Sequence, residues 1–306
     1  MVAFVLRRFA SLGLVLFCVV TITFFLVRLA PGGPFARERK IPEAIEKQLL
    51  ARYKLDGTLW QQYSDYVGDL LHGDLRLSTK FRDRSVNELI GQSLPVSLQV
   101  GCTAFLLATV GGVWLGSLAA VRHRSWVDAT AMLGALFAIS IPAFVTGPVL
   151  VLIFALKLGW LPVGGWTSWK SLVLPAITLA GPYVAYIARL MRSSMLEVLG
   201  QDFVRTAKAK GLSPGTVLYK HALKVAILPV VSFLGPLAAN LLTGSIVIEA
   251  IFAIPGAGSF FVNSIINRDV FLLSGIIIVY CALLVVLNLA VDLAYTLLDR
   301  RIKLYD

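Results

Sequence analysis

The feature that most constrains the fold is a basic stretch, residues 201–229, enclosed by two strongly apolar segments. Its cations are Arg205, Lys208, Lys210, Lys220 and Lys224, against the single acid Asp202. Each charge at the centre of a bilayer costs about 2.5 to 3.5 kcal/mol. The stretch must therefore lie in water, while the apolar segments on either side are suited to cross a membrane.

Local signals predict that this loop is folded. Gly200 ends the preceding helix, and Asp202 is the predicted N-cap of a short helix over residues 203–210. Gly211 stands where a left-handed C-cap is required, and Ser213 caps a second helix that begins with Pro214, where the missing N–H costs nothing. Two short helices are thus expected to meet at a sharp corner.

Composition supports a membrane protein. Of 306 residues, 58% are hydrophobic and 15% charged, whereas soluble domains are usually about 45 to 50% apolar. The net charge of +11 is interpreted as an orientation signal and not as a nucleic-acid surface. The three cysteines lie in apolar runs, and metal-binding, nucleophile and Walker-type motifs are missing from the sequence, so we predict neither a catalytic site nor a metal site.

Six apolar segments predict an all-α polytopic fold: residues 9–30, 96–121, 129–156, 171–191, 226–248 and 271–298. The alternative for the first, a cleaved signal peptide, is disfavoured because its apolar run is longer than the usual 7 to 15 residues. Prolines interrupt the third span at Pro142 and Pro148. The glycine-broken stretch 248–269 is expected to form a short re-entrant helix.

Residues 31–95 form a hydrophilic, nearly neutral insertion. Apolar spacing predicts helices over residues 42–55 and 59–70, the second ending at His72-Gly73, and Ser85 with Glu88 forms the capping-box pattern of a third. The expected organisation is residues 1–30 (tail and first span), the periplasmic helical insertion 31–95, and a five-helix core 96–306 that includes the loop 201–224.

Orientation follows from the distribution of Lys and Arg. They concentrate at the termini and in the loops after the second and fourth spans, whereas the two short opposite loops hold only Lys157, Lys170 and Arg268. The positive-inside bias therefore predicts cytoplasmic termini and a cytoplasmic loop 201–224.

Several motifs resemble permease subunits of bacterial ATP-binding cassette importers. Arg205, Thr206 and Ala207, with Gly211 further on, match the "EAA" loop of that family, although Arg205 replaces its glutamate. RTAKAKGL followed by HALK resembles the peptide and nickel branch. RLAPGGPF (28–35), HGDL (72–75) and IEAIFAIPGAG extend the resemblance over nearly the whole chain and are most similar to oligopeptide permease B subunits.

The resemblance implies a type I importer permease in the inner membrane, with a coupling helix between spans four and five. Its expected partners are a second similar permease, two ATPase subunits that bind ATP and Mg²⁺, and a periplasmic peptide-binding protein. No cofactor is expected in this chain itself. The implied ATPase contact consists of Arg205, Thr206, Ala207, Lys208, Gly211 and Leu212.

Some assignments remain open. Glu249, at the outer end of span five, either contacts substrate in the path or bonds the re-entrant turn. Asn288 and Asp292 are interpreted as packing groups and not as a proton relay. Dipeptides, nickel or another solute are alternative substrates. An ion-coupled secondary transporter and an intramembrane enzyme are more remote alternatives, because inverted repeats and paired reactive groups within spans are not seen.

Overall fold

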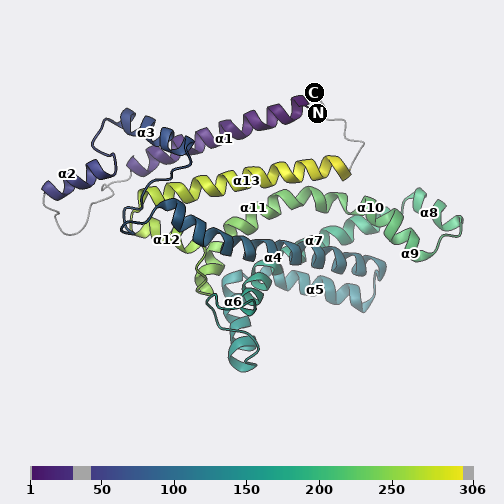
Figure 1. The fold of residues 1–306 in the computed structure, drawn as a ribbon. Coiled ribbons are helices and arrows are strands. Elements are labelled where there is room, and N and C mark those ends of the chain that lie inside the picture. Colours follow the sequence, from purple (N-terminus) through teal and green to yellow (C-terminus); the bar gives the residue numbers. More distant parts are fainter. Residues whose placement is uncertain (1, 30–42, 299–306) are drawn as a thin grey trace. The chain divides into compact units, whose positions relative to one another are not determined.

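The computed structural model describes residues 2–29 and 43–298. Within these ranges the regular secondary structure is helical, apart from one isolated bridge between Leu77 and Ser85 (Figure 1). Residues 30–42, with most of the RLAPGGPF motif, and the basic C-terminal residues Arg300, Arg301 and Lys303 lie outside the described residues. So do the side chains of Arg7, Arg8 and Asp292.

The helices follow the chain in this order: α1 (Val2–Leu29), α2 (Glu43–Arg52), α3 (Leu59–Leu71), α4 (Val86–Val121), α5 (Trp126–Ser140), α6 (Ala143–Leu150), η1 (Val151–Lys157), α7 (Lys170–Leu199), α8 (Asp202–Ala209), α9 (Pro214–Thr216), η2 (Val217–Ala222), α10 (Leu223–Ala226), α11 (Leu228–Ile251), α12 (Ala257–Ile266) and α13 (Val270–Leu298).

The number of helices that could span a membrane agrees in outline with the six spans predicted from the sequence. Within the described residues four helices are long and apolar enough to span a bilayer, and two bent pairs raise the number to six if each pair counts as one span. The pair Trp126–Ser140 and Ala143–Lys157 bends by 107°. Ile141 before Pro142 is extended (φ −92°, ψ 120°), as residues before proline usually are. The predicted third span is thus sharply broken.

The chain divides into two compact units. The first contains Met1–Val96 and Gly256–Val286. Its core is aromatic: Phe24 of α1, Tyr63 and Tyr66 of α3, and Phe271 of α13 are all buried, and their rings lie edge-on or tilted against one another. The predicted amphipathic helices of the insertion are present as α2 and α3, and α3 ends at His72 and Gly73 (φ 77°) as expected.

The third predicted helix of the insertion is not a separate element. Ser85 caps it, since Ser85 Oγ accepts a hydrogen bond from the Glu88 N–H at 3.1 Å, but the helix continues through Pro95 as the 36-residue α4. The third predicted insertion helix and the second span therefore form one continuous helix. Proline is tolerated within membrane helices because neighbouring groups take up the backbone bonds that it frees.

Asp269, directly before α13, links two segments of this unit by hydrogen bonds. Asp269 is 1% exposed, and its carboxylate accepts hydrogen bonds from the Ser78 hydroxyl and from the Thr79 N–H at 3.1 Å. The loop after α3 is thereby fastened to the NRD motif. The short helix α12 occupies the stretch for which a re-entrant helix was predicted.

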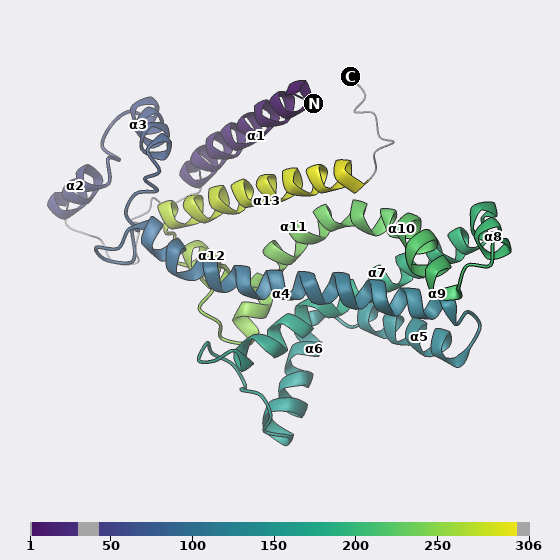
Figure 2. The ribbon, with the colours of Figure 1, turned by 45° about the vertical axis from the view of Figure 1, so that its right-hand side comes forward.

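The second unit contains Ser97–Pro255 and Leu287–Tyr305. Within it α5 and α7 lie side by side (Figures 1 and 2). α4 approaches α7 closely at its glycines: a Cβ on Gly112 would lie 2.6 Å from Ile187 Cβ, and one on Gly116 would lie 2.8 Å from Met191 Cβ. The small-residue pair predicted for helix contact therefore packs against α7.

Candidate functional site

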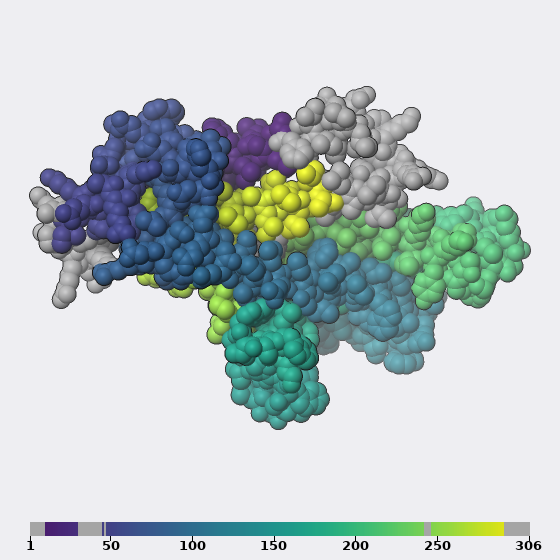
Figure 3. All heavy atoms as spheres, in the orientation of Figure 1, coloured from purple at the N-terminus to yellow at the C-terminus, as the bar shows by residue number. Residues whose placement is uncertain are grey.

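The candidate site is the turn between α7 and α10, which carries the predicted coupling residues. We call residues 202–216 the basic corner. It projects as a lobe from the end of the α4, α5 and α7 helices that is remote from α6 (Figures 1 and 3, green). α7 ends at Leu199 with Gly200 as its C-cap, so only Gly200 and Gln201 separate that 30-residue helix from α8.

The corner has a defined backbone geometry. Gly211 is left-handed (φ 78°); its N–H donates to the Lys208 carbonyl at 3.0 Å, and the Leu212 N–H donates to the Ala207 carbonyl at 3.4 Å. These two bonds are the pair that defines a Schellman C-cap. Ser213 Oγ then accepts from the Thr216 N–H at 3.3 Å, with Pro214 in the first turn of α9. The predicted Gly-Leu-Ser corner is confirmed.

One capping residue was predicted wrongly. The N-cap of α8 is Gln201, whose side chain makes no capping bond, and Asp202 is the first residue inside the helix. An acid in the first turn still interacts favourably with the helix dipole. Asp202 also lies 3.5 Å from Arg205, but both side chains are largely exposed, so this ion pair adds little.

The six predicted coupling residues do not share one environment. Arg205, Thr206, Lys208 and Gly211 are exposed, and Leu212 is 38% exposed. Ala207 instead is 6% exposed and packs inward with Val204. The outward surface is therefore cationic with an apolar component from Leu212 and from Phe203, which is also 38% exposed. Ala207 and Val204 therefore lie on the buried face of α8.

Glu249 lies on α11 and is fully buried. In this conformation its carboxylate does not face an open path. Among the described residues no group of His, Cys, Asp or Glu has the clustering that a metal ion needs.

A polar cluster that we did not predict lies around Asp128, at the start of α5. The side chain is 6% exposed and receives two hydrogen bonds from Arg192 of α7. One signal was available: Asp128 is the only acid between residues 89 and 196 of the sequence, and it stands three residues after the N-cap Ser125. Its partner, 64 residues away, could not be identified from sequence spacing.

Comparison with known proteins places the chain in a family. Residues 112–304 match the family described as "Binding-protein-dependent transport system inner membrane component". The chain is 44% identical over 305 residues to the oligopeptide transport system permease protein OppB of Haemophilus influenzae and to that of Escherichia coli K12, covering 99% of this chain and 100% of each relative. It is 45% identical over 305 residues to the dipeptide transport system permease protein DppB of Bacillus subtilis, covering 100% of this chain and 99% of the relative.

A chain of the MetNI methionine ABC transporter, solved in inward-facing conformations, has a similar fold: the TM-score is 0.57 at 19% identity, covering 69% of this chain and 97% of that chain. The resemblance inferred from the motifs around Gly211 is confirmed by these matches. The chain is a multi-pass membrane protein that belongs to the family of inner membrane components of binding-protein-dependent transport systems.

Proposed function

We propose that this chain is one of two membrane subunits of an ATP-driven importer and forms half of a translocation path for oligopeptides. The full-length similarity to OppB proteins supports this proposal. The identity to a dipeptide permease, 45%, is as high as the identity to the OppB proteins, so dipeptides are the second candidate substrate. Nickel is a more distant alternative.

The observation that carries the mechanism is the basic corner. Its two capping bonds fix the angle between α8 and α9, and its outward surface combines Arg205 and Lys208 with the exposed apolar residues Phe203 and Leu212. Apolar groups that form a patch rimmed by polar residues mark contact sites with other proteins. We assign this surface to a groove of a partner ATPase.

Movement would pass through α7. Because only two residues separate it from α8, displacement of the basic corner displaces the end of a 30-residue helix. ATP and Mg²⁺ would be bound and hydrolysed by the two ATPase subunits, and their closure would turn the permease pair from inward- to outward-facing. A periplasmic peptide-binding protein would deliver the substrate.

We propose that the chain lies in a bacterial inner membrane with both termini and the basic corner in the cytoplasm, and with the 31–95 insertion and α12 on the periplasmic side. The Lys and Arg distribution supports this orientation. Glu249, buried in the present conformation, is proposed to border the path when the subunits move.

The test is uptake by the complete importer in proteoliposomes with ATP inside, using labelled peptides of two, three and five residues. Oligopeptide function predicts ATP-dependent accumulation of the three- and five-residue peptides in the presence of the binding protein. Accumulation of the dipeptide alone would assign the chain to dipeptide transport. Uptake without any ATPase subunit would overturn the proposal.

A further inference from the structure

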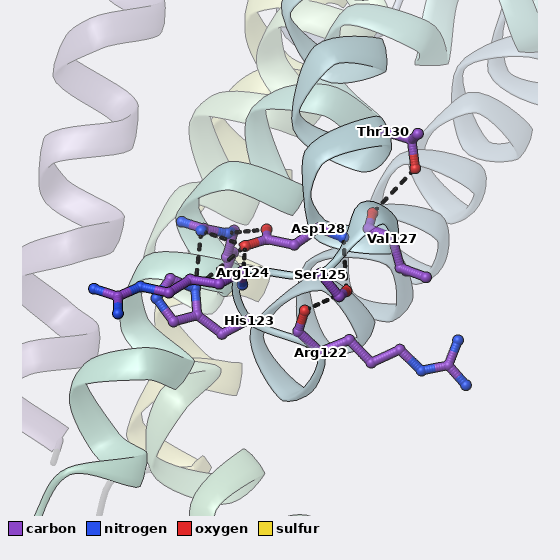
Figure 4. A network of polar contacts seen from close by, with 8 residues as sticks. Arg122, His123, Arg124, Ser125, Val127, Asp128 and Thr130 are labelled. Carbon is purple, nitrogen blue, oxygen red and sulfur yellow. Dashed lines mark hydrogen bonds and ion pairs between the residues drawn. The ribbon is translucent and has the colours of Figure 1, made fainter.

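The cluster around Asp128 joins three parts of the second unit. Arg192 Nε donates to Asp128 Oδ1 at 2.5 Å, and Arg192 Nη2 donates to Oδ2 at 2.7 Å. Oδ2 also accepts the backbone N–H of Arg124 at 3.0 Å and lies 3.2 Å from His123 Nδ1. Figure 4 shows the carboxylate of Asp128 directed toward Arg124 and His123 in the turn between α4 and α5. We call this arrangement the carboxylate clamp.

The clamp is a two-pronged contact between a buried carboxylate, Asp128 (6% exposed), and a half-buried guanidinium, Arg192 (24% exposed). Removing a carboxylate from water is costly unless charged donors and hydrogen bonds replace the water, and a guanidinium that donates through two nitrogens meets that need. The exposed pair Arg52 and Asp83 has a similar contact distance of 2.7 Å, but its side chains are 52% and 80% exposed. The clamp therefore fixes relative position in a way that a surface ion pair does not.

The location of the clamp gives it mechanical significance. Arg192 lies on α7, eight residues before Gly200, at the end of the helix that leads into the basic corner. One residue earlier on α7, Met191 belongs to the surface against which Gly116 of α4 packs. The close helix contact and the clamp thus bind α4, α5 and α7 together at the end of α7 that receives the corner's displacement.

We infer that the pair Asp128 and Arg192 is a coupling element that makes the α4–α5 turn move with α7, so that displacement of the basic corner reaches three helices and not one. The inference rests on the proposed function, because it requires that the corner be displaced by a partner. Asp128 and Arg192 are positioning residues here, because both act through the helices that they hold together.

The first test measures uptake and ATP hydrolysis separately in the reconstituted complete importer. Asp128→Asn and Arg192→Gln should each reduce peptide uptake about tenfold or more, within the range of coupling between linked sites, while ATP hydrolysis stimulated by the binding protein continues. The double variant should lose no more than the single variants, because both remove one contact. Asp83→Asn, which breaks the exposed pair, is the matched control and should transport normally.

Arg192→Lys covers the case in which the first variants do not assemble. It keeps the charge but loses the two-pronged contact, so it should assemble and show a smaller loss of uptake at preserved ATP hydrolysis. Uptake and hydrolysis that fall in proportion, or losses that multiply in the double variant, would overturn the inference.

A second readout follows the relative movement itself. Spin labels at Trp126→Cys, whose native side chain is 77% exposed, and at the exposed Ser193→Cys report the distance between α5 and α7. That distance should stay constant through the ATP cycle in the otherwise native chain and change on ATP binding in Asp128→Asn. An equal response in both chains would contradict the clamp.

Failure of the clamp is distinguishable from failure of the proposed function. A crosslink from Lys208→Cys to an ATPase subunit should persist in Asp128→Asn, because the clamp acts after that contact. If the crosslink forms but the spin-label distance between α5 and α7 responds to ATP equally with and without Asp128, only the inference about the clamp is overturned. A crosslink missing from every chain, including the one with Asp128 intact, overturns the proposed function on which the inference rests.

Discussion

Gly211→Val tests the corner geometry by a change that affects backbone conformation and little else. Gly211 adopts φ 78°, which residues with a β-carbon avoid, especially β-branched ones. A Cβ at this position would meet no heavy atom within 4 Å. The substitution therefore adds conformational strain without a steric clash.

The size of the effect follows from the left-handed conformation. Holding a β-branched residue there costs about 2 kcal/mol, within the range of 1 to 3 kcal/mol for such strain. Since about 1.4 kcal/mol corresponds to a factor of ten, the native corner becomes about 30-fold less populated relative to opened alternatives. Uptake that requires the native corner should fall by a similar factor. Gly211→Asn should lose much less, because asparagine tolerates this conformation.

The assay is ATP-driven peptide uptake normalised to the amount of permease assembled in the membrane. Gly215→Val is the matched control: it adds the same side chain within the same corner, at a glycine without positive φ and with no heavy atom within 4 Å of a built Cβ. Normal uptake by a fully assembled Gly211→Val importer would refute the reasoning. So would an equal loss in Gly211→Asn, since the effect would then not arise from backbone conformation.

Three further outcomes are expected. Gly116→Val should destabilise the contact between α4 and α7 by about 1 to 3 kcal/mol, measured as a lower melting temperature of the assembled importer, whereas Gly68→Val, with open space around it, should not. Ser213→Ala should cost about 1 kcal/mol of cap stability, visible as faster amide exchange in α9 with no change in the melting temperature. Burial acts to raise the pKa of Asp69, but hydrogen bonds from Arg76 and a lysine outweigh it and the pKa is lowered. Asp69→Asn should therefore reduce stability at pH 7. The difference should begin to shrink as the pH falls below about 4, where the unfolded carboxylate takes up its proton, and should disappear only when the pH has fallen through the lowered pKa of the folded carboxylate.

Local signals in the sequence were sufficient to predict the geometry of the basic corner. Gly211, Ser213 and Pro214 each act through their own backbone or through a neighbour within three residues, so their positions predict the turn without knowledge of the rest of the fold. The same holds for the helix that ends at His72 and Gly73.

Whether a proline breaks a helix could not be predicted from the local sequence. Pro142 separates two helices that differ in direction by 107°, yet Pro175 and Pro182 lie inside α7 and Pro95 lies inside α4. The residue type is the same in each case. What differs is whether packing and neighbouring polar groups hold the helix on both sides of the proline, and that information is spread over distant parts of the chain.

The carboxylate clamp was missed for a similar reason. A single acid after a serine cap is typical of an ordinary helix start, and Ser125 does accept the Asp128 N–H at 3.4 Å. Asp128 also pairs with Arg192 only because the fold brings α7 beside the start of α5. For Ala207 the helical period was the better guide. The motif groups this residue with exposed ones, but its position in the helical repeat turns it inward.

The most direct measurement of the central claim is crosslinking from the exposed face of α8 in the assembled importer, with Thr206→Cys as the reporter and an inward position, Val204→Cys, as the control. The account predicts a crosslink from position 206 to an ATPase subunit, with a yield that changes when ATP binds, and little from position 204. An importer that transports peptide while position 206 never reaches an ATPase would contradict it.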